Sequence, residues 1–298
     1  MPNITQLKAD DLTLAHSKPS LIAVSPIVSI QTALNLLQNN KITSLPVFSH
    51  NSTQVVSIVN LFDILLYLMG RSDTTVDNTA SKLNDPVEYV LGLDSDRESY
   101  RMHKTDSQDT LLETLRAFAS GIHRSLVVDY AKANNEGTWL LSQTDIMQHI
   151  RKHPESTEGL VDINATVGSL GFDKKPPLVS VSASQTALSG YRLIAEKRLS
   201  GVPIVDENGN LVGDLCLEDL PGANLDTFDK LTLPCIEYVK YHMDTIALPV
   251  ATPETTLKEV IDIMITQDTH RVWIKQDEQS QKVIGVISMS DVIGLLCK

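Results

Sequence analysis

The sequence predicts a mixed α/β (α+β) protein made of four copies of one β-α-β-β-α unit. Four hydrophobic strands each lead into a helix whose first turn contains an aspartate, at Asp63, Asp145, Asp219 and Asp291. These residues are separated by 82, 74 and 72 positions, and self-similarity at a nearly constant period indicates a repeat architecture. Between the strands, apolar residues recur at the spacing of an amphipathic helix.

The fourth copy, residues 283–293, is the best preserved. Its hydrophobic strand turns through Ser288 and Ser290 into a helix that begins around Asp291. A carboxylate in the first turn of a helix is favoured by the helix dipole and accepts hydrogen bonds from the N–H groups there. Capping alone explains one such aspartate, whereas four at equivalent positions favour a shared role in binding, least of all for Asp63.

The first two copies show the elements of the unit in order. Ser25-Pro26 is typical of a helix start, and Gly70 is typical of a helix end. The expected elements are a strand at 21–24, a helix at 25–37, strands at 45–48 and 55–59, a helix at 63–69, a short helical patch at 87–91, a helix at 109–119, a strand at 125–129 and a strand from 138 into the next helix.

The last two copies follow the same order, and Asn208-Gly209 is a strong hairpin signal in copy 3. The expected elements are strands at 178–181 and 202–206, a helix at 185–199, a strand at 246–250, a helix at 255–265 and the strand and helix of 283–293. The patterns divide the chain into repeats at 1–70, 100–153, 178–223 and 245–298, connectors at 71–99 and 224–244, and a linker between modules at 154–177.

Basic residues distinguish odd repeats from even ones. Repeats 1 and 3 carry Lys41 and Arg198 five positions before a strand proline. Repeats 2 and 4 instead carry a His-Arg pair at the mouth of the same strand, His123-Arg124 and His270-Arg271. A single unit cannot bury both faces of a three-stranded sheet, so each should pair with another. We therefore expect a duplicated two-unit module, with repeat 1 paired with 2 and repeat 3 with 4.

Composition limits the function classes. The formal net charge of −12 argues against non-specific binding to nucleic acid or to an anionic membrane, although a few focused cations can still bind a small phosphate compound. No run of eighteen apolar residues predicts a membrane span, and the first residues do not resemble a secretory signal. Three scattered cysteines predict neither disulfides nor a metal site. We expect a cytoplasmic protein that also enters the nucleus.

The runs at 121–129, 198–206, 269–272 and 285–291 make the chain resemble proteins with four cystathionine-β-synthase (CBS) motifs, arranged as two Bateman modules. The resemblance covers nearly the whole chain. Within this superfamily the chain is most similar to the gamma, or SNF4-type, subunit of AMP-activated protein kinase. Trp273 and the run 141–145 are also similar to other four-motif CBS proteins of plants and fungi, including phosphatase regulators.

The resemblance implies a flat, pseudo-symmetric disc that binds AMP, ADP or ATP in clefts between paired repeats, without a prosthetic group. A carboxylate that accepts from two adjacent hydroxyls is a known way to hold ribose, and arginine matches phosphate oxygens with two parallel bonds. The implied ribose ligands are Asp145, Asp219 and Asp291, with Asp63 a poorer match. The implied phosphate ligands are His123, Arg124, Arg198, His270, Arg271, Ser288 and Ser290, with Lys197 a poorer match.

Several positions depart from the family pattern. Repeat 1 has Asn60 and Ser57 where a hydroxyl residue and glycine are usual, and repeat 3 has Cys216 at the hydroxyl position. Pro221-Gly222 should shorten the helix of repeat 3. In animal gamma subunits the second repeat lacks the aspartate and its site is empty, whereas Asp145 is present here.

No catalytic motif emerges from the sequence, which contains neither a glycine-rich phosphate loop nor a nucleophile with a paired base. The leading hypothesis is a non-catalytic, nucleotide-sensing subunit that acts on a kinase through its catalytic (alpha) and scaffold (beta) subunits. The alternative is a nucleotide-tuned adaptor that regulates a phosphatase or another partner. An enzyme that hydrolyses or transfers phosphate is the third, least favoured reading.

Overall fold

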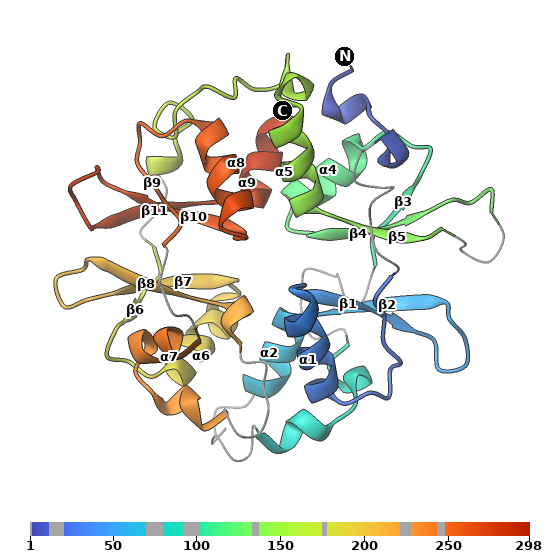
Figure 1. Cartoon of the computed structure of the whole chain (residues 1–298), viewed down its shortest axis with the longest axis horizontal. Helices are drawn as coiled ribbons and strands as arrows, with labels where there is room; N and C mark the ends of the chain where they lie inside the picture. The colour runs from blue at the N-terminus through green and yellow to red at the C-terminus, as the bar shows by residue number, and fades with distance from the viewer. Residues whose placement is uncertain are drawn as a thin grey trace. The chain divides into compact units, whose positions relative to one another are not determined.

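Four small sheets, one in each repeat, form the framework of the structure, a computed structural model (Figure 1). It describes residues 2–11, 21–69, 80–91, 102–132, 137–174, 178–220, 228–242 and 248–298. The strands are β1 (Ser44–Phe48), β2 (Val55–Asn60), β3 (Lys104–Asp106), β4 (Arg124–Val128), β5 (Trp139–Ser142), β6 (Val181–Ser182), β7 (Gly201–Val205), β8 (Leu211–Cys216), β9 (Val250–Ala251), β10 (Arg271–Lys275) and β11 (Val283–Ser288).

The sheets share one topology. In repeats 2 to 4 the first, short strand is parallel to the middle strand, and the last strand is antiparallel to it. In repeat 1 the expected strand at 21–24 is reduced to one parallel bridge between Val24 and Val47. The α/β fold class and the three-strand repeat predicted from the sequence are therefore confirmed, with one strand shortened to a single bridge.

Each sheet carries a helix before its middle strand and, except in repeat 3, another after its last strand. The helices are α1 (Ile30–Asn40), α2 (Leu61–Met69), α4 (Leu112–Ala119), α5 (Gln143–Lys152), α6 (Ala187–Lys197), α7 (Cys235–His242), α8 (Leu257–Thr266) and α9 (Met289–Leu296). In repeat 3 the last helix is only the 3-10 turn η9 (Leu217–Asp219), as the sequence predicted. Gly70 and Pro221-Gly222, which were expected to end helices, lie outside the described residues.

The structure differs from the expected elements at the start of α1 and at α7. Helix α1 begins at Ile30 and not at Ser25, because the Ser29 hydroxyl caps it by accepting from the Thr32 N–H at 3.1 Å. The backbone around Pro26 instead accepts a bond from the Glu88 N–H at 3.0 Å, which keeps this segment out of the helix. Helix α7 lies where the sequence predicted only a connector at 224–244.

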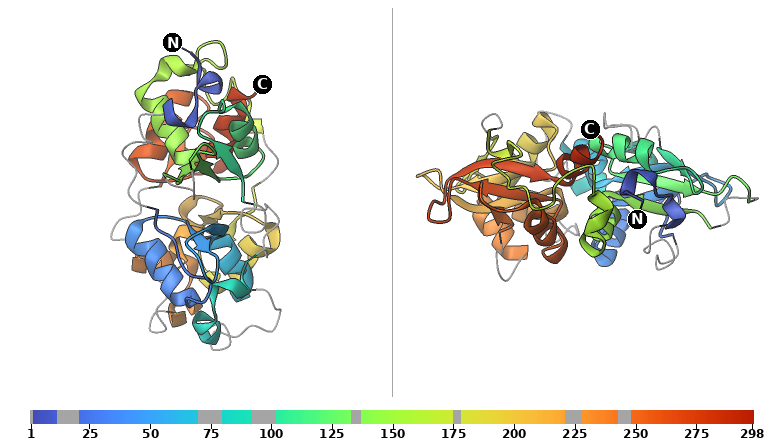
Figure 2. Two further views of the ribbon diagram at one scale, coloured as in Figure 1. Left: turned by 90° about the vertical axis from the view of Figure 1, so that its right-hand side faces the viewer. Right: turned by 90° about the horizontal axis from the view of Figure 1, so that it is seen from above.

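The chain forms two compact units that interleave along the sequence. Unit 1 consists of residues 1–21, 103–178 and 247–298 and contains repeats 2 and 4. Unit 2 consists of residues 22–102 and 179–246 and contains repeats 1 and 3. In Figures 1 and 2 the green and red helices α4, α5, α8 and α9 of unit 1 gather against one another.

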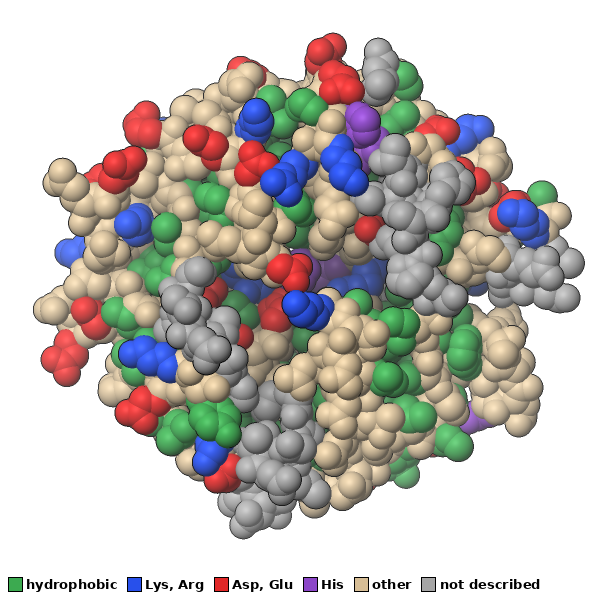
Figure 3. Space-filling model, in the orientation of Figure 1, with side chains coloured by type: hydrophobic (Ala, Val, Ile, Leu, Met, Phe, Trp, Pro, Cys, Tyr) green, Lys and Arg blue, Asp and Glu red, His purple; other side chains and the backbone are tan. Residues whose placement is uncertain are grey.

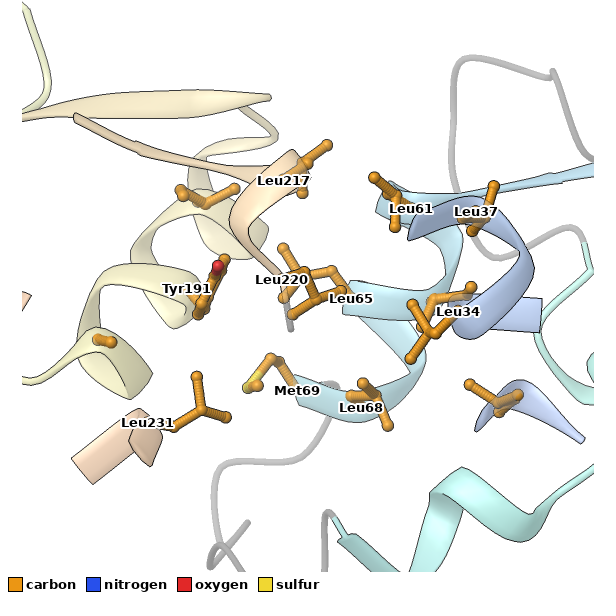
Figure 4. Packing of buried hydrophobic residues seen from close by; sticks show 14 of the residues in the cluster. Leu34, Leu37, Leu61, Leu65, Leu68, Met69, Tyr191, Leu217, Leu220 and Leu231 are labelled. Atoms are coloured by element: carbon orange, nitrogen blue, oxygen red, sulfur yellow. The ribbon is translucent and has the colours of Figure 1, made fainter. Parts of the chain in front are cut away.

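Each unit has one hydrophobic core. In unit 2, α2 packs against α6 and η9, and Leu65, Leu68 and Met69 meet Tyr191 and Leu220 in a buried cluster (Figure 4). In unit 1, α4 packs against α9, and α5 against α8. Each core thus combines helices of alternate repeats, those of repeats 1 and 3 in unit 2 and those of repeats 2 and 4 in unit 1.

Glycine at one strand position lets the linker approach a sheet. An added Cβ at Gly285 would lie 2.9 Å from the Phe172 carbonyl oxygen and 3.0 Å from Ile274 Cδ1. Phe172 opens the 3-10 turn η8 (Phe172–Lys174), which lies against β11. The linker predicted at 154–177 is therefore a packed part of unit 1. None of the helices in the described parts of the chain has the length and apolar composition needed to cross a membrane.

Candidate functional site

The same small structure, called a corner here, occurs in every repeat where the last strand ends. Its cap residue directly faces the first residue of the middle strand, in the pairs Ser44–Asn60, Arg124–Ser142, Gly201–Cys216 and Arg271–Ser288. The residue before the middle strand accepts a bond from the first helical N–H through its carbonyl oxygen; these residues are Thr43, His123, Ser200 and His270. A corner is therefore formed by two adjacent strands and one helix start: the two residues at the mouth of the middle strand, the cap residue, and the first helical turn with its aspartate.

All four predicted aspartates cap their own helix or turn. Asp145 Oδ2 accepts from the Ser142 N–H at 2.7 Å and from the Ser142 hydroxyl at 2.8 Å, and Asp291 Oδ2 accepts the same two bonds from Ser288 at 2.8 and 2.6 Å. Asp219 Oδ2 accepts from the Cys216 N–H at 2.8 Å. These reciprocal capping bonds hold each carboxylate at the strand end.

The first corner differs because an amide replaces the hydroxyl. The Asp63 N–H donates to Asn60 Oδ1 at 2.8 Å, and the Asn60 N–H donates to Asp63 Oδ2 at 3.0 Å. Asp63 is fully buried. The structure thus gives Asp63 a capping role, and its poorer match in the sequence agrees with this difference in chemistry.

Two of the four corners are cationic. Arg124 and Arg271 stand directly opposite the cap serines Ser142 and Ser288, so each arginine lies beside a capped aspartate. The odd corners carry Thr43-Ser44 and Ser200-Gly201 at the same positions. Both cationic corners belong to unit 1, so the predicted difference between odd and even repeats becomes a difference between the two units.

Lys41 and Arg198 are not equivalent to the His-Arg pairs. They occupy the residue after α1 and α6, where the backbone is left-handed with φ of 51° and 52°. Gly121 and Asp268 occupy the same place in repeats 2 and 4, with φ of 102° and 49°. At each place the next residue's N–H bonds back to the helix, which is a Schellman ending. Three of these four residues carry a side chain in a conformation that glycine adopts most easily.

The remaining predicted phosphate ligands fall into three situations. Ser288 uses its hydroxyl within the cap of α9, as donor to Asp291 Oδ2 and acceptor from the Asp291 N–H. Ser290 accepts a bond from Gln143 Nε2 at 2.8 Å. Lys197 lies exposed in the last turn of α6, with its Nζ 2.9 Å from Glu196 Oε1.

The third corner has supports that the sequence analysis missed. The Tyr238 hydroxyl donates to the Asp219 carbonyl oxygen at 2.6 Å, and the Tyr191 hydroxyl donates to that of Cys216 at 3.3 Å. Burial raises the pKa of both tyrosines above the ordinary value, so both stay neutral. Both tyrosines bond backbone carbonyl groups of a 3-10 turn that does not continue into an α-helix. Tyr238 was missed because α7, which carries it, was read as a connector.

The two cationic corners touch each other within unit 1. Gln143 Nε2 donates to Ser290 Oγ at 2.8 Å, and the Thr144 hydroxyl lies 3.8 Å from Met289 Sδ. In unit 2 the residues equivalent to Gln143 are Leu61 and Leu217, which lie in the apolar cluster drawn in Figure 4. The junction between corners is therefore partly polar in unit 1 and apolar in unit 2.

One face of the described surface shows how the charged side chains are distributed. On the face drawn in Figure 3, the described Lys and Arg side chains are interspersed with Asp and Glu. Within the described ranges, no group of three or more His, Cys, Asp or Glu side chains could hold a metal ion.

A protein-family comparison identifies the repeats. The family model described as CBS domain matches residues 13–70, 167–223 and 239–298, more than half of the chain. The chain belongs to the CBS-domain family. Repeat 2 lies outside the matched ranges, yet its sheet and its capped Asp145 follow the same plan as the other CBS repeats. The resemblance found in the sequence is thus confirmed at the level of the family.

Relatives of this CBS-domain protein fall into two named groups. It is 22% identical to Protein SDS23 of Kluyveromyces lactis, over 93% of this chain and 60% of the relative. It is also 22% identical to the SNF1-related protein kinase regulatory subunit gamma-like PV42a of Arabidopsis thaliana, over 98% of this chain and 95% of the relative. The chain therefore spans a little over half the length of several SDS23 relatives but nearly all of the gamma-like one.

A solved structure supports the fold. A protein from Methanocaldococcus jannaschii, described as a candidate archaeal homologue of the AMPK gamma subunit, superposes with a TM-score of 0.73 at 18% identity. The match covers 93% of this chain and 96% of the archaeal one. It supports the fold along nearly the whole chain.

Proposed function

We propose that this CBS-domain protein is a non-catalytic regulatory subunit that binds AMP, ADP or ATP and passes the state of its sites to a protein kinase complex. The observation that carries the proposal is the pair of cationic corners in unit 1. Each combines an arginine, a histidine, a serine cap and an aspartate on adjacent strand ends. In the described structure, these two corners are the places where a guanidinium that can bind phosphate lies beside a carboxylate held by capping bonds.

The chemistry of a corner suits a ribose phosphate. A guanidinium binds phosphate oxygens through two parallel charge-assisted bonds, and an imidazole beside it adds a third donor. A carboxylate accepts from adjacent ribose hydroxyls. In the even corners the aspartate is already oriented by its capping bonds through Oδ2, so a hydroxyl that approaches meets a carboxylate that does not need to be ordered first.

Isothermal titration calorimetry of the full chain with AMP, ADP, ATP, adenosine and inorganic phosphate tests the proposal. We expect the phosphorylated nucleosides to bind and adenosine to bind more weakly. Arg271→Gln should weaken nucleotide binding about 10- to 100-fold, since a hydrogen bond to a charged group contributes about 1.5–3 kcal/mol. Lys258→Gln, an exposed change on α8, serves as the matched control and should bind as the wild type does. The absence of heat with all three nucleotides would refute the proposal.

We consider two kinds of partner. The gamma-like relative, matched along nearly its whole length, is named as a protein kinase regulatory subunit and favours a kinase complex. The catalytic (alpha) and scaffold (beta) subunits, and the second candidate of an adaptor that regulates a phosphatase or another partner, rest on the resemblance found in the sequence. Affinity capture of the full chain from its own cells, followed by identification of the bound catalytic subunit, separates the two. A kinase supports the first candidate and a phosphatase the second.

The expected location, the cytoplasm with access to the nucleus, remains part of the proposal. Fluorescence microscopy of the tagged full chain tests it, and retention in a membrane-bound compartment would contradict it. An enzymatic role is tested by incubating the purified chain with ATP and measuring phosphate release. Turnover that is lost in Arg271→Gln would replace the regulatory proposal with an enzymatic one.

A further inference from the structure

One buried side chain contacts both cationic corners of unit 1. Gln143 is 5% exposed and lies at the first position of α5, two residues before Asp145. Its Nε2 donates to the Phe118 carbonyl oxygen at 2.9 Å and to Ser290 Oγ at 2.8 Å, with a longer approach of 3.4 Å to the Ile122 carbonyl oxygen. Its backbone N–H donates to the His123 carbonyl oxygen at 3.1 Å.

The direction of these bonds is determined by chemistry. Carbonyl oxygens only accept, so the amide nitrogen of Gln143, and not its oxygen, must face Phe118 and Ile122. The same nitrogen then donates to Ser290, whose oxygen accepts. Because the serine oxygen is used as an acceptor, its own hydrogen is directed toward a different acceptor. A hydroxyl that accepts one bond is a stronger donor in the next.

Comparison of the four repeats shows that this polar contact is unusual. The residues equivalent to Gln143 are Leu61, Leu217 and Met289, all buried and apolar. A buried amide costs free energy unless it is hydrogen-bonded, so a leucine would satisfy the packing of this position more simply. Gln143 places this amide at the junction between the two corners that carry a His-Arg pair.

We propose that Gln143 is a positioning residue that couples anion binding at the two even corners. It orients Ser290 of the fourth corner as a donor to an anionic ligand, and it holds the segment that ends in His123 of the second corner. When a ligand accepts a hydrogen bond from the Ser290 hydroxyl, the bond from Gln143 Nε2 to Ser290 Oγ becomes stronger. This changes how firmly Gln143 holds the segment that ends in His123. This proposal rests on the proposed nucleotide binding, which names the ligand of each corner.

The test compares Gln143→Leu with the wild type. Leucine is the natural residue at the equivalent places in repeats 1 and 3, so the variant should fold, as circular dichroism and thermal unfolding will verify. Calorimetry with AMP should show about 3- to 10-fold weaker binding at the fourth corner, the effect of one lost hydrogen bond. Leu61→Met, at the apolar junction of unit 2, is the matched control and should leave AMP binding unchanged.

Coupling is measured with a thermodynamic cycle. AMP affinity at the fourth corner is compared with and without Arg124→Gln at the second corner, in the wild-type and the Gln143→Leu backgrounds. We expect Arg124→Gln to change that affinity several-fold in the first background and hardly at all in the second. Equal effects in both backgrounds would overturn the proposal.

A ligand-free measurement keeps this result separate from failure of the proposed function. The imidazole signals of His123 in the NMR spectrum should shift in Ser290→Ala, and the shift should vanish when Gln143→Leu is already present. If AMP does not bind but this pattern appears, the coupling between the corners is supported and the proposed nucleotide ligand is refuted. If AMP binds and His123 does not respond to Ser290→Ala, the link is refuted while the proposed function stands.

Discussion

At the scale of residues, the aspartate that recurs in each corner has two possible roles, helix capping and ribose binding, which variants can separate. Asp291 Oδ2 is used in capping, and the same carboxylate is the candidate for ribose binding. Asp291→Ala should lower the free energy of unfolding by about 1 kcal/mol, because the Ser288 N–H loses its acceptor. Urea denaturation measures this change.

The amide variant distinguishes the two roles of Asp291. Asp291→Asn keeps an oxygen that can accept from the Ser288 N–H, so stability should recover most of the loss. Nucleotide binding should remain weakened, because the negative charge is gone. Full recovery of binding together with stability would mean that the aspartate acts only as a cap.

His149 is a buried residue with a pH-dependent consequence. It is 4% exposed on α5, and neither ring nitrogen has a hydrogen-bond partner in the described parts of the chain. Burial lowers the pKa of His149 below its ordinary value of 6.5, with a further contribution from His153 and, more weakly, Lys152, while Glu155 opposes it. The unfolded chain therefore takes up a proton near pH 6.5 that the folded chain does not accept.

The sign of the effect follows from this difference. Stability should fall as the pH drops below about 6.5, because the unfolded state binds more protons there. In His149→Leu this loss should be smaller. Unfolding midpoints at pH 7.5, 6.5 and 5.5 measure it, with His50→Gln, an exposed histidine on the surface, as the control. An identical pH dependence in His149→Leu and the wild type would contradict the assignment.

The candidate site was only partly predictable at this scale. The aspartates and the His-Arg pairs were found because they recur at equivalent places, so the comparison of copies supplied the signal. Gln143 departs from its three apolar counterparts, and that departure was the available clue. Tyr238 gave no such signal, because its role depends on a carbonyl group brought to it by tertiary structure.

At the scale of elements, all four repeats share one feature: the helix before the middle strand ends in a residue with a left-handed backbone. An added Cβ at Gly121, with φ of 102°, meets nothing within 4 Å, so Gly121→Ala should cost only backbone strain, about 1–2 kcal/mol. Lys41→Gly should instead stabilise the chain by up to about 1 kcal/mol, since glycine is freer to adopt this conformation. Thermal unfolding of the two variants measures the opposite signs.

Helices and strands were predicted well where short stretches of sequence determine them. Helix α8 and strand β11 follow from a capping box at Thr256 and Glu259 and from a continuous apolar run. The start of α1 was wrong because Ser25-Pro26 satisfies a local rule that the 3-10 turn η5 (Val87–Tyr89) overrides through backbone bonds. Non-local contacts of this kind leave no pattern in a short stretch of sequence.

At the scale of the whole molecule, neither half of the chain contains a complete core. Residues 1–153 carry repeats 1 and 2, whose helices pack against those of repeats 3 and 4. Each half made alone should expose these apolar faces and therefore self-associate. Sedimentation of the separate halves should show dimers or larger species, and mixing them should yield a 1:1 complex. A folded, monomeric half would contradict the interleaved cores.

The interleaving also determines how the chain can be made. Helix α2 ends at Met69, but its partner α6 begins only at Ala187, 118 positions later. At about 5–20 residues per second, translation leaves the apolar face of α2 without its partner for on the order of ten seconds. Contacts between segments so distant in sequence also form slowly. We therefore expect the growing chain to need protection during synthesis, and the first repeat to complete its core only after the third has left the ribosome.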